Sequence, residues 1–156
     1  MRFLLIDKIL KLIPGKSIVA TKTMQPGEEL FRDHFPGFPV VPGVLLTEMM
    51  AQAAGKCLDA EKSPRGRAML GKISNATFRH WVAPGELAVI TAAIDCNREE
   101  FATAKCHVEV KDKRVCSADL FFVFVPYGQF AAGYRDELLE SYFRENRLHD
   151  TETGPS

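Results

Sequence analysis

One segment near the middle of the chain limits what the rest can fold into, because it must be buried on almost every side. After Pro42 and Gly43 the sequence runs Val-Leu-Leu-Thr-Glu-Met-Met-Ala-Gln-Ala-Ala-Gly-Lys-Cys-Leu. Leucine, methionine, alanine and glutamine all favour helix, and proline is tolerated in the first helical turn. We therefore predict a helix over about 42–60. Its apolar residues fall all round the axis, which indicates a core helix that other elements surround.

Three polar residues interrupt this apolar surface, and their spacing places them on one face. Glu48, Gln52 and Lys56 are four residues apart, so they lie one above another on a helix. A carboxylate on a buried helix is costly unless it is paired, neutral or used for chemistry. Glu48 is therefore a candidate catalytic acid, whereas most glutamates in helices are simply solvated.

The segment that leads into the helix supplies further candidates. Residues 34–43 read His-Phe-Pro-Gly-Phe-Pro-Val-Val-Pro-Gly, and their prolines and glycines predict rigid turns. His34 is a candidate base, because histidine exchanges protons readily near neutral pH. At Gly43, the free N–H groups that begin a helix are suited to hold negative charge. The alternative is that His34, like most single histidines in loops, has a structural role or is simply exposed to solvent.

Residues 34–52 resemble the signature of the FabZ-type 3-hydroxyacyl-acyl carrier protein dehydratases. The resemblance rests on His-Phe-Pro-Gly-Phe-Pro-Val-Val-Pro-Gly-Val-Leu, followed by Glu48 and then Ala-Gln. The acid follows the histidine by fourteen positions (48 − 34), as in the family. A glutamate here is typical of the FabZ type, whereas the related dehydratase-isomerases have aspartate. Residues 78–86, Phe-Arg-His-Trp-Val-Ala-Pro-Gly-Glu, resemble a later strand and turn of the family, and the match covers roughly 4–125.

The resemblance implies an enzyme that removes water from 3-hydroxyacyl thioesters in fatty acid or related acyl-chain biosynthesis. Such an elimination needs a base, a donor for the developing enolate, and an acid for the departing hydroxyl. The expected base is His34, the expected donor is the Gly43 N–H, and the expected acid is Glu48 in the neutral form that burial favours. By its position in the motif, the Val40 carbonyl would fix the histidine ring. Gln52 either orients Glu48 or a water molecule, or is a helix-face amide that contacts the sheet.

The resemblance also implies partners. In the family the histidine of one subunit faces the acid of the other, so a homodimer is needed for a complete site, and hexamers form as trimers of dimers. Acyl carrier protein is acidic, and its candidate contacts here are Arg65, Arg67, Lys72 and Arg79. Each of these is also consistent with ordinary solvated surface. No metal, nucleotide or redox cofactor is expected, because the sequence has no metal-ligand spacing, P-loop or GxGxxG motif.

The overall composition fits a single globular domain in the cytoplasm. The 156 residues have a formal net charge of zero, which gives no reason to expect nucleic acid or an anionic membrane as a partner. The four cysteines form no CxxC pair, so we expect a reducing compartment. We expect neither a signal peptide nor a membrane span, because charges interrupt the apolar N-terminal residues early and no apolar run is long enough.

Strand patterns on both sides of the predicted helix indicate what covers it. Residues 4–13 and 17–24 read as a hairpin around a Pro-Gly-Lys turn. β-Branched and apolar residues then predict four strands, at about 68–79, 86–96, 101–110 and 114–125. One helix wrapped by a curved antiparallel sheet is an α+β arrangement, and the resemblance implies the hot-dog fold. We expect this dehydratase domain to span 1–126.

The remaining residues predict an addition to that domain. We expect a helical extension over 127–148 and a disordered tail over 149–156. An apolar stripe between charges predicts an amphipathic helix at about 133–147, and its members are Tyr134, Leu138, Leu139, Tyr142 and Phe143. We expect this helix to pack on the sheet or on a neighbouring subunit, and binding of a separate partner is the alternative.

Two other functions remain open. A thioesterase can have the same fold, but such enzymes usually lack the His-Phe-Pro-Gly, Pro-Gly and Glu arrangement. A non-catalytic or specialised acyl-thioester-binding protein would keep the fold without turnover. Release of free thiol would favour the former, and tight binding without dehydration would favour the latter. Within the dehydratase interpretation, a polyketide-type pathway is as open as primary fatty acid synthesis.

Overall fold

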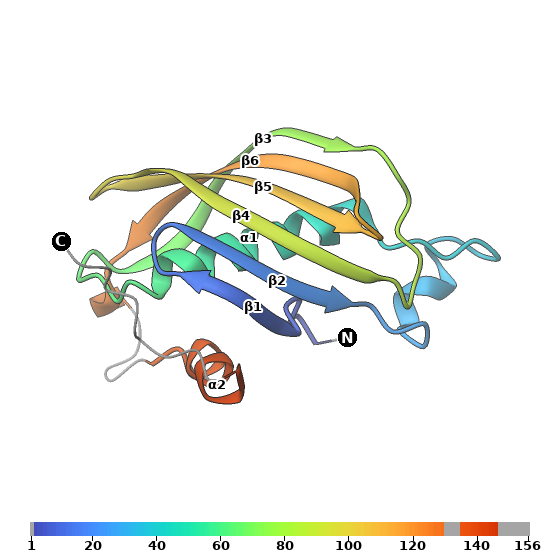
Figure 1. Cartoon of the computed structure of the whole chain (residues 1–156), viewed down its shortest axis with the longest axis horizontal. Helices are drawn as coiled ribbons and strands as arrows, with labels where there is room; N and C mark the ends of the chain where they lie inside the picture. Colours follow the sequence, from blue (N-terminus) through green and yellow to red (C-terminus); the bar gives the residue numbers. More distant parts are fainter. Residues whose placement is uncertain (1, 130–134, 147–156) are drawn as a thin grey trace.

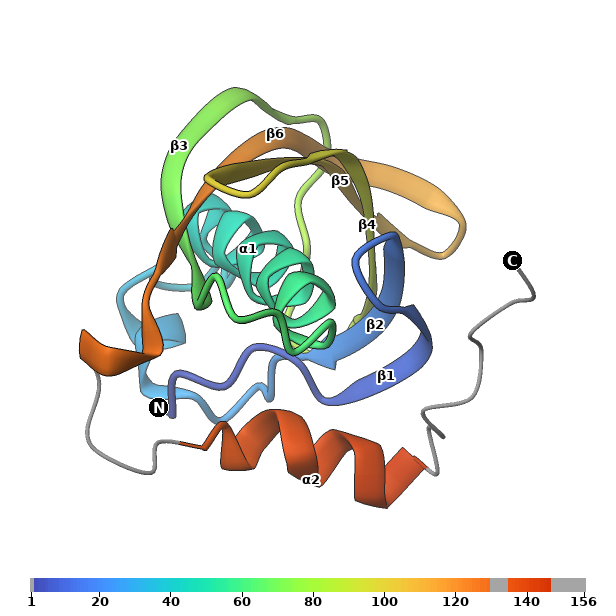
Figure 2. The same cartoon turned by 90° about the vertical axis from the view of Figure 1, so that its left-hand side faces the viewer.

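The chain folds as one curved antiparallel sheet that wraps a central helix (Figures 1 and 2). In the computed structural model, residues 2–129 and 135–146 are described. The central helix α1 spans Gly43–Asp59, and a second helix α2 spans Glu137–Asn146. The arrangement is the α+β hot-dog fold, which confirms the prediction.

Six strands form the sheet, in the order β1-β2-β4-β5-β6-β3. Their bounds are Lys8–Ile13 for β1, Ser17–Thr23 for β2, Arg67–Phe78 for β3, Leu87–Asn97 for β4, Phe101–Val110 for β5 and Lys113–Val125 for β6. β3 precedes β4 in the chain but pairs with β6 at the far edge. The connection over 79–86 therefore crosses the N-terminal end of α1, where the Val41 N–H donates to the Val82 carbonyl at 2.7 Å (Figure 1).

The observed strands lie close to the predicted ones, except at the start of the first hairpin. We predicted a strand from residue 4, but β1 begins at Lys8. Leu5 and Ile6 are fully buried, yet the Leu5 N–H donates to the side chain of Gln52 on α1, at 3.0 Å. The segment ahead of β1 is thus held against the helix and not in a sheet ladder.

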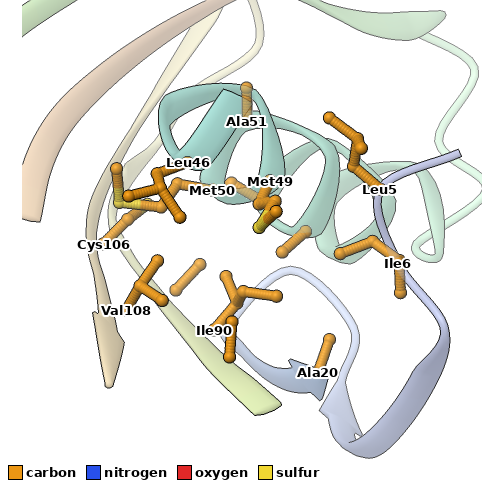
Figure 3. Packing of buried hydrophobic residues seen from close by; sticks show 14 of the residues in the cluster. Leu5, Ile6, Ala20, Leu46, Met49, Met50, Ala51, Ile90, Cys106 and Val108 are labelled. Atoms are coloured by element: carbon orange, nitrogen blue, oxygen red, sulfur yellow. The ribbon is translucent and has the colours of Figure 1, made fainter. Parts of the chain in front are cut away.

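The core forms between α1, the concave face of the sheet and the segment ahead of β1 (Figure 3). Its side chains are almost completely removed from solvent; they include Leu5, Ile6, Leu46, Met49, Met50, Ile90 and Val108. Burial of each such side chain contributes on the order of 1.5–3 kcal/mol. Packing therefore fixes the position of α1 far more strongly than its helix propensity does.

One face of α1 lies outside this core, so the prediction that the helix is buried on almost every side is only partly right. Val44 is 75% exposed, and Glu48 and Gln52 on the same face are half-buried. Apolar residues all round a helix predict burial, but they do not distinguish the chain's own core from the surface of a second chain. This face is exposed at Val44, half-buried at Glu48 and Gln52 and buried at Lys56, and it carries the predicted acid.

The predicted C-terminal helix is present but shorter than expected. α2 contacts β1 and lies beside the N-terminal segment (Figure 2). Leu139 and Tyr142 are buried, and the Tyr142 hydroxyl donates to the Ile6 carbonyl. Tyr134 and the predicted tail over 149–156 lie outside the described residues. No helix in the described part of the chain is long and apolar enough to cross a membrane.

Candidate active site

His34 lies in a loop that is closed on itself ahead of α1. The Val40 N–H donates to the His34 carbonyl at 3.0 Å, and the ring Nδ1 of His34 lies 3.1 Å from the Val40 carbonyl oxygen. Because a carbonyl oxygen only accepts, Nδ1 carries the proton in this contact, and the Nε2 of a neutral ring keeps a free lone pair. The ring also stacks on Phe35, with centroids 4.1 Å apart. The loop thus orients the imidazole, through the Val40 contact that the resemblance implies.

The first turn of α1 presents backbone N–H groups next to this loop. Pro42 is extended, with φ −55° and ψ 136°, and no side chain among the described residues caps the helix after it. The first N–H groups of a helix lack intrahelical acceptors and mark its positive end. Gly43 is the first helical residue, and a Cβ there would lie 3.1 Å from the ring of Phe78. Glycine therefore keeps the space beside this N–H group open.

Gln52 holds Glu48 in place and ties the N-terminal segment to α1. Its Nε2 donates to Glu48 Oε1 and to the Phe3 carbonyl, both at 3.2 Å. Its Oε1 accepts the Leu5 N–H at 3.0 Å. Of the two interpretations of Gln52, these contacts match the one in which the amide orients the carboxyl group.

Glu48 lines a groove of about 400 Å³ that follows the exposed face of α1. The floor is the helix itself, and the walls are the N-terminal segment, the start of β3 and part of β6. The lining residues include Phe3, Leu4, Glu48, Ala51, Gln52, Gly55, Met69, Leu70 and Phe122. Neither His34 nor Gly43 lines this groove. Within one chain, the groove that the predicted acid lines is therefore not lined by the predicted base.

Similarity to known proteins identifies the family. A family model described as a FabA-like domain matches residues 1–119. The chain belongs to the FabA-like domain family.

Two curated members of this family are named 3-hydroxyacyl-[acyl-carrier-protein] dehydratase FabZ. The protein from Lactobacillus helveticus is 44% identical over 121 residues, which cover 77% of this chain and 82% of the relative. The one from Levilactobacillus brevis is 42% identical with the same coverage. Among solved structures, the dehydratase heterocomplex ApeI:P from Xenorhabdus doucetiae aligns with a TM-score of 0.65 and 15% identity, over 81% of this chain and 86% of the other. That likeness supports the fold alone.

The four basic residues proposed as carrier-protein contacts have different surroundings in this FabA-like domain. Arg65 is almost buried and donates to two oxygens of the β4–β5 turn, both at 2.6 Å. Arg67 is paired with two aspartates. Lys72 on β3 and Arg79 just beyond it are exposed. Two of the four thus make internal contacts, and the carrier-binding role of all four stays a prediction.

Four charged side chains, here called the charge cluster, meet where the groove reaches the C-terminal end of α1: Lys56, Asp59, Arg67 and Asp136. Arg67 lies 3.6 Å from an oxygen of Asp59 and 3.2 Å from one of Asp136. Burial raises the pKa of Asp59 to about 6 and lowers that of Lys56, which is only 8% exposed. Among the described residues, no group of His, Cys, Asp or Glu side chains could hold a metal ion.

Sequence reasoning missed this charge cluster. Only the helical spacing of Lys56 and Asp59 was visible, because Arg67 and Asp136 come from later parts of the chain. The family match ends at residue 119, within β6, so α2 and its Asp136 lie beyond it. The FabA-like domain model therefore covers Lys56, Asp59 and Arg67 but not Asp136, the fourth member of the cluster.

Replacing Asp59 with asparagine should stabilise the fold at neutral pH, and the gain should shrink in acid. The folded-state pKa of about 6 lies above the ordinary value of 3.8, so between these values the native state binds more protons than the unfolded state. The contribution of Asp59 to the free energy of unfolding is therefore greatest below pH 3.8, and it is lost as the pH rises through about 6. Asparagine keeps an oxygen acceptor for the Ala68 N–H, which now donates at 2.8 Å. We expect a gain on the order of 2–3 kcal/mol near pH 7.5 and little near pH 4.

Urea unfolding followed by circular dichroism, at both pH values, measures this difference. Asp95→Asn, at an exposed position, is the matched control and should change stability little at either pH. An equal effect of Asp59→Asn at the two pH values would contradict the account of the buried carboxyl group.

Proposed function

We propose that this protein dehydrates 3-hydroxyacyl thioesters, carried by acyl carrier protein, to trans-2-enoyl thioesters in fatty acid or related acyl-chain biosynthesis. The observation that carries the proposal is the identity of 44% and 42% to two FabZ dehydratases over most of the chain. The spacing of His34 and Glu48, each oriented by a hydrogen bond, supports the same conclusion.

In the proposed reaction, His34 is the base and Glu48 is the acid. Nε2 of His34 takes a proton from the carbon next to the thioester carbonyl, because Nδ1 is engaged by Val40. The Gly43 N–H holds the charge that develops on the carbonyl oxygen. A double bond forms as the carbon–oxygen bond at the next carbon breaks, and a neutral Glu48 gives its proton to the leaving hydroxyl, which departs as water.

A complete site of this kind needs two copies of the chain. β3 is an edge strand whose unpaired edge is open to a partner, and several large apolar side chains on it and near it are exposed. They include Met69, Leu70, Ile73, Phe78 and Trp81, together with Val44 on α1. We propose a homodimer through this surface, in which His34 of one protomer meets Glu48 of the other. A hexamer built from three such dimers is the larger assembly that the family resemblance implies.

The carrier protein is proposed to dock near the same edge. Lys72 and Arg79 are exposed on and just after β3, and they are the basic residues best placed to meet an acidic partner. Arg65 and Arg67 already hold internal contacts, so they would contribute less. The cytoplasm is the proposed compartment, because acyl carrier protein would deliver the substrate there.

Replacing Glu48 with glutamine should remove most dehydration activity while the fold is kept. Glutamine has nearly the same shape and can still pair with Gln52, but it cannot give a proton to the leaving hydroxyl. We expect kcat to fall about 10²–10⁴-fold. Hydration of crotonyl thioesters, on coenzyme A and on acyl carrier protein side by side, follows the reaction by absorbance.

The matched control is Glu100→Gln, at an exposed position beyond β4, which should behave as wild type. Near-normal turnover of Glu48→Gln would exclude the acid role. A thiol reagent in parallel reactions detects any thioesterase activity, and release of thiol without hydration would overturn the proposed function.

Replacing Gly43 with proline should remove the oxyanion donor without breaking the helix. Proline fits the first helical position, and the extended Pro42 suits a following proline. Gly43→Ala is the control, because it adds the same crowding against Phe78 but keeps the N–H. We expect kcat of the proline variant to lie about 10²–10³-fold below that of the alanine variant. Equal kcat values for the two variants would rule out the donor.

A further inference from the structure

We propose that the charge cluster and α2 form a stop at the end of the groove, which limits the length of the acyl chain that the protein accepts. The proposal rests on the proposed function, because it assumes that the substrate's acyl chain lies in the groove that Glu48 lines. It adds a specificity determinant of which Asp136 and α2 lie beyond the FabA-like match.

The groove has a direction, set by the residues of α1 that form its floor. It contains Glu48, Gln52, Lys56 and Asp59, which lie on one side of the helix. Lys56 is eight residues from Glu48 (56 − 48), or about 12 Å along the axis at the rise of an α-helix. An extended hydrocarbon chain advances about 1.3 Å per carbon, so a chain whose reacting carbons lie at Glu48 has room for about nine further carbons before it reaches the charge cluster.

The two ends of the groove differ in chemistry. Between Glu48 and Lys56, the floor has small residues and the walls are apolar: Ala51, Gly55, Met69, Leu70 and Phe122. Such a lining suits a chain of methylene groups. The far end holds Lys56, Asp59 and Arg67, and Asp136 pairs with Arg67 from behind.

Contact with the charge cluster is unfavourable for a hydrocarbon chain. Its two cations and two carboxylates face one another, so the buried charges compensate one another. Methylene groups pushed against them would displace the remaining water without replacing its hydrogen bonds, which is unfavourable. A substrate chain that ends in a carboxylate would not be stabilised here either, because Asp59 and Asp136 already neutralise the charge of the two cations.

α2 lies at this end of the groove. Asp136 caps the helix by accepting the Leu139 N–H at 2.9 Å, while its other oxygen faces Arg67. Leu138 itself lines the groove. Tyr142 anchors the helix to the body of the protein through the Ile6 carbonyl, and Lys56 lies 5.4 Å from the centre of the Tyr142 ring. α2 is therefore joined to the body of the protein both at its N-terminal cap and at Tyr142.

The proposal predicts how rate depends on chain length. In an apolar groove, each added methylene group that is buried should raise kcat/KM about fourfold. We expect such a rise up to about twelve carbons, followed by a fall of at least tenfold from the maximum once the chain meets the stop. The measurement is kcat/KM for 3-hydroxyacyl thioesters of four, eight, twelve and sixteen carbons on the full-length protein.

Two variants test the stop by different means. The double substitution Lys56→Met with Asp136→Asn removes one charge of each sign, so the cluster stays neutral and the α2 cap keeps an oxygen acceptor. Leu138→Ala removes a side chain that lines the groove, without changing charge. In both, the ratio of kcat/KM for sixteen carbons to that for twelve should rise at least tenfold. Leu10→Ala is the control: the residue is exposed on β1 and is not part of the groove, so the ratio should not change.

Thermal melting shows whether each variant is folded, and either variant alone is sufficient for the test. A wild-type enzyme that dehydrates the sixteen-carbon substrate as well as the twelve-carbon one would overturn the stop. So would folded variants whose ratio equals that of wild type. A wild-type protein that is inactive on substrates of every chain length would instead overturn the proposed function, and the proposed stop with it.

Discussion

The need to bury α1 organises the whole molecule. Its apolar side chains occupy the concave side of the sheet, and the strands curve around them. The same helix presents its first N–H groups beside His34 and its half-buried face, with Glu48, to the groove. Any change that moved α1 in the core would therefore move the proposed oxyanion donor, Gly43, and the proposed acid, Glu48, together. Core packing and site geometry are two consequences of one buried helix.

The loop ahead of α1 is rigid for reasons that are independent of the core. Its backbone closes through His34 and Val40, and the crossover connection holds it through Val41 and Val82. Because this crossover comes from β3, the edge of the sheet and the histidine loop are mechanically linked. A second protomer bound at β3 would thus meet a surface on which His34, the proposed base, is already oriented. In this way the proposed dimer would place Glu48 of one protomer beside the oriented His34 of the other.

Local sequence patterns predicted the elements well, because each element depends mainly on its own residues. The helix after Pro42 and the strands β4, β5 and β6 are examples. His34 and Val40 are only six residues apart, and the contact between them was implied by the motif that contains both. The catalytic use of these residues is a further step, and it stays a proposal.

Features that join distant parts of the chain were not predictable in the same way. Periodicity indicated an amphipathic C-terminal helix, but not that Tyr142 would reach Ile6, 136 residues away in sequence. The charge cluster likewise needs Arg67 and Asp136 brought to the end of α1 by the folded sheet. The exposed face of the helix around Val44 was misjudged because apolar composition indicates burial without indicating which chain provides it.

The claim that two protomers share each site is tested most directly by mixing inactive variants. His34→Ala and Glu48→Gln chains are co-expressed with different tags, and the dimers that carry both tags are purified. If the two groups meet across the interface, each mixed dimer has one intact site and should recover roughly half the activity per dimer of the wild type. If both groups of a site belonged to one chain, no mixed dimer would contain an intact site, and activity no greater than that of the separate variants would contradict the account.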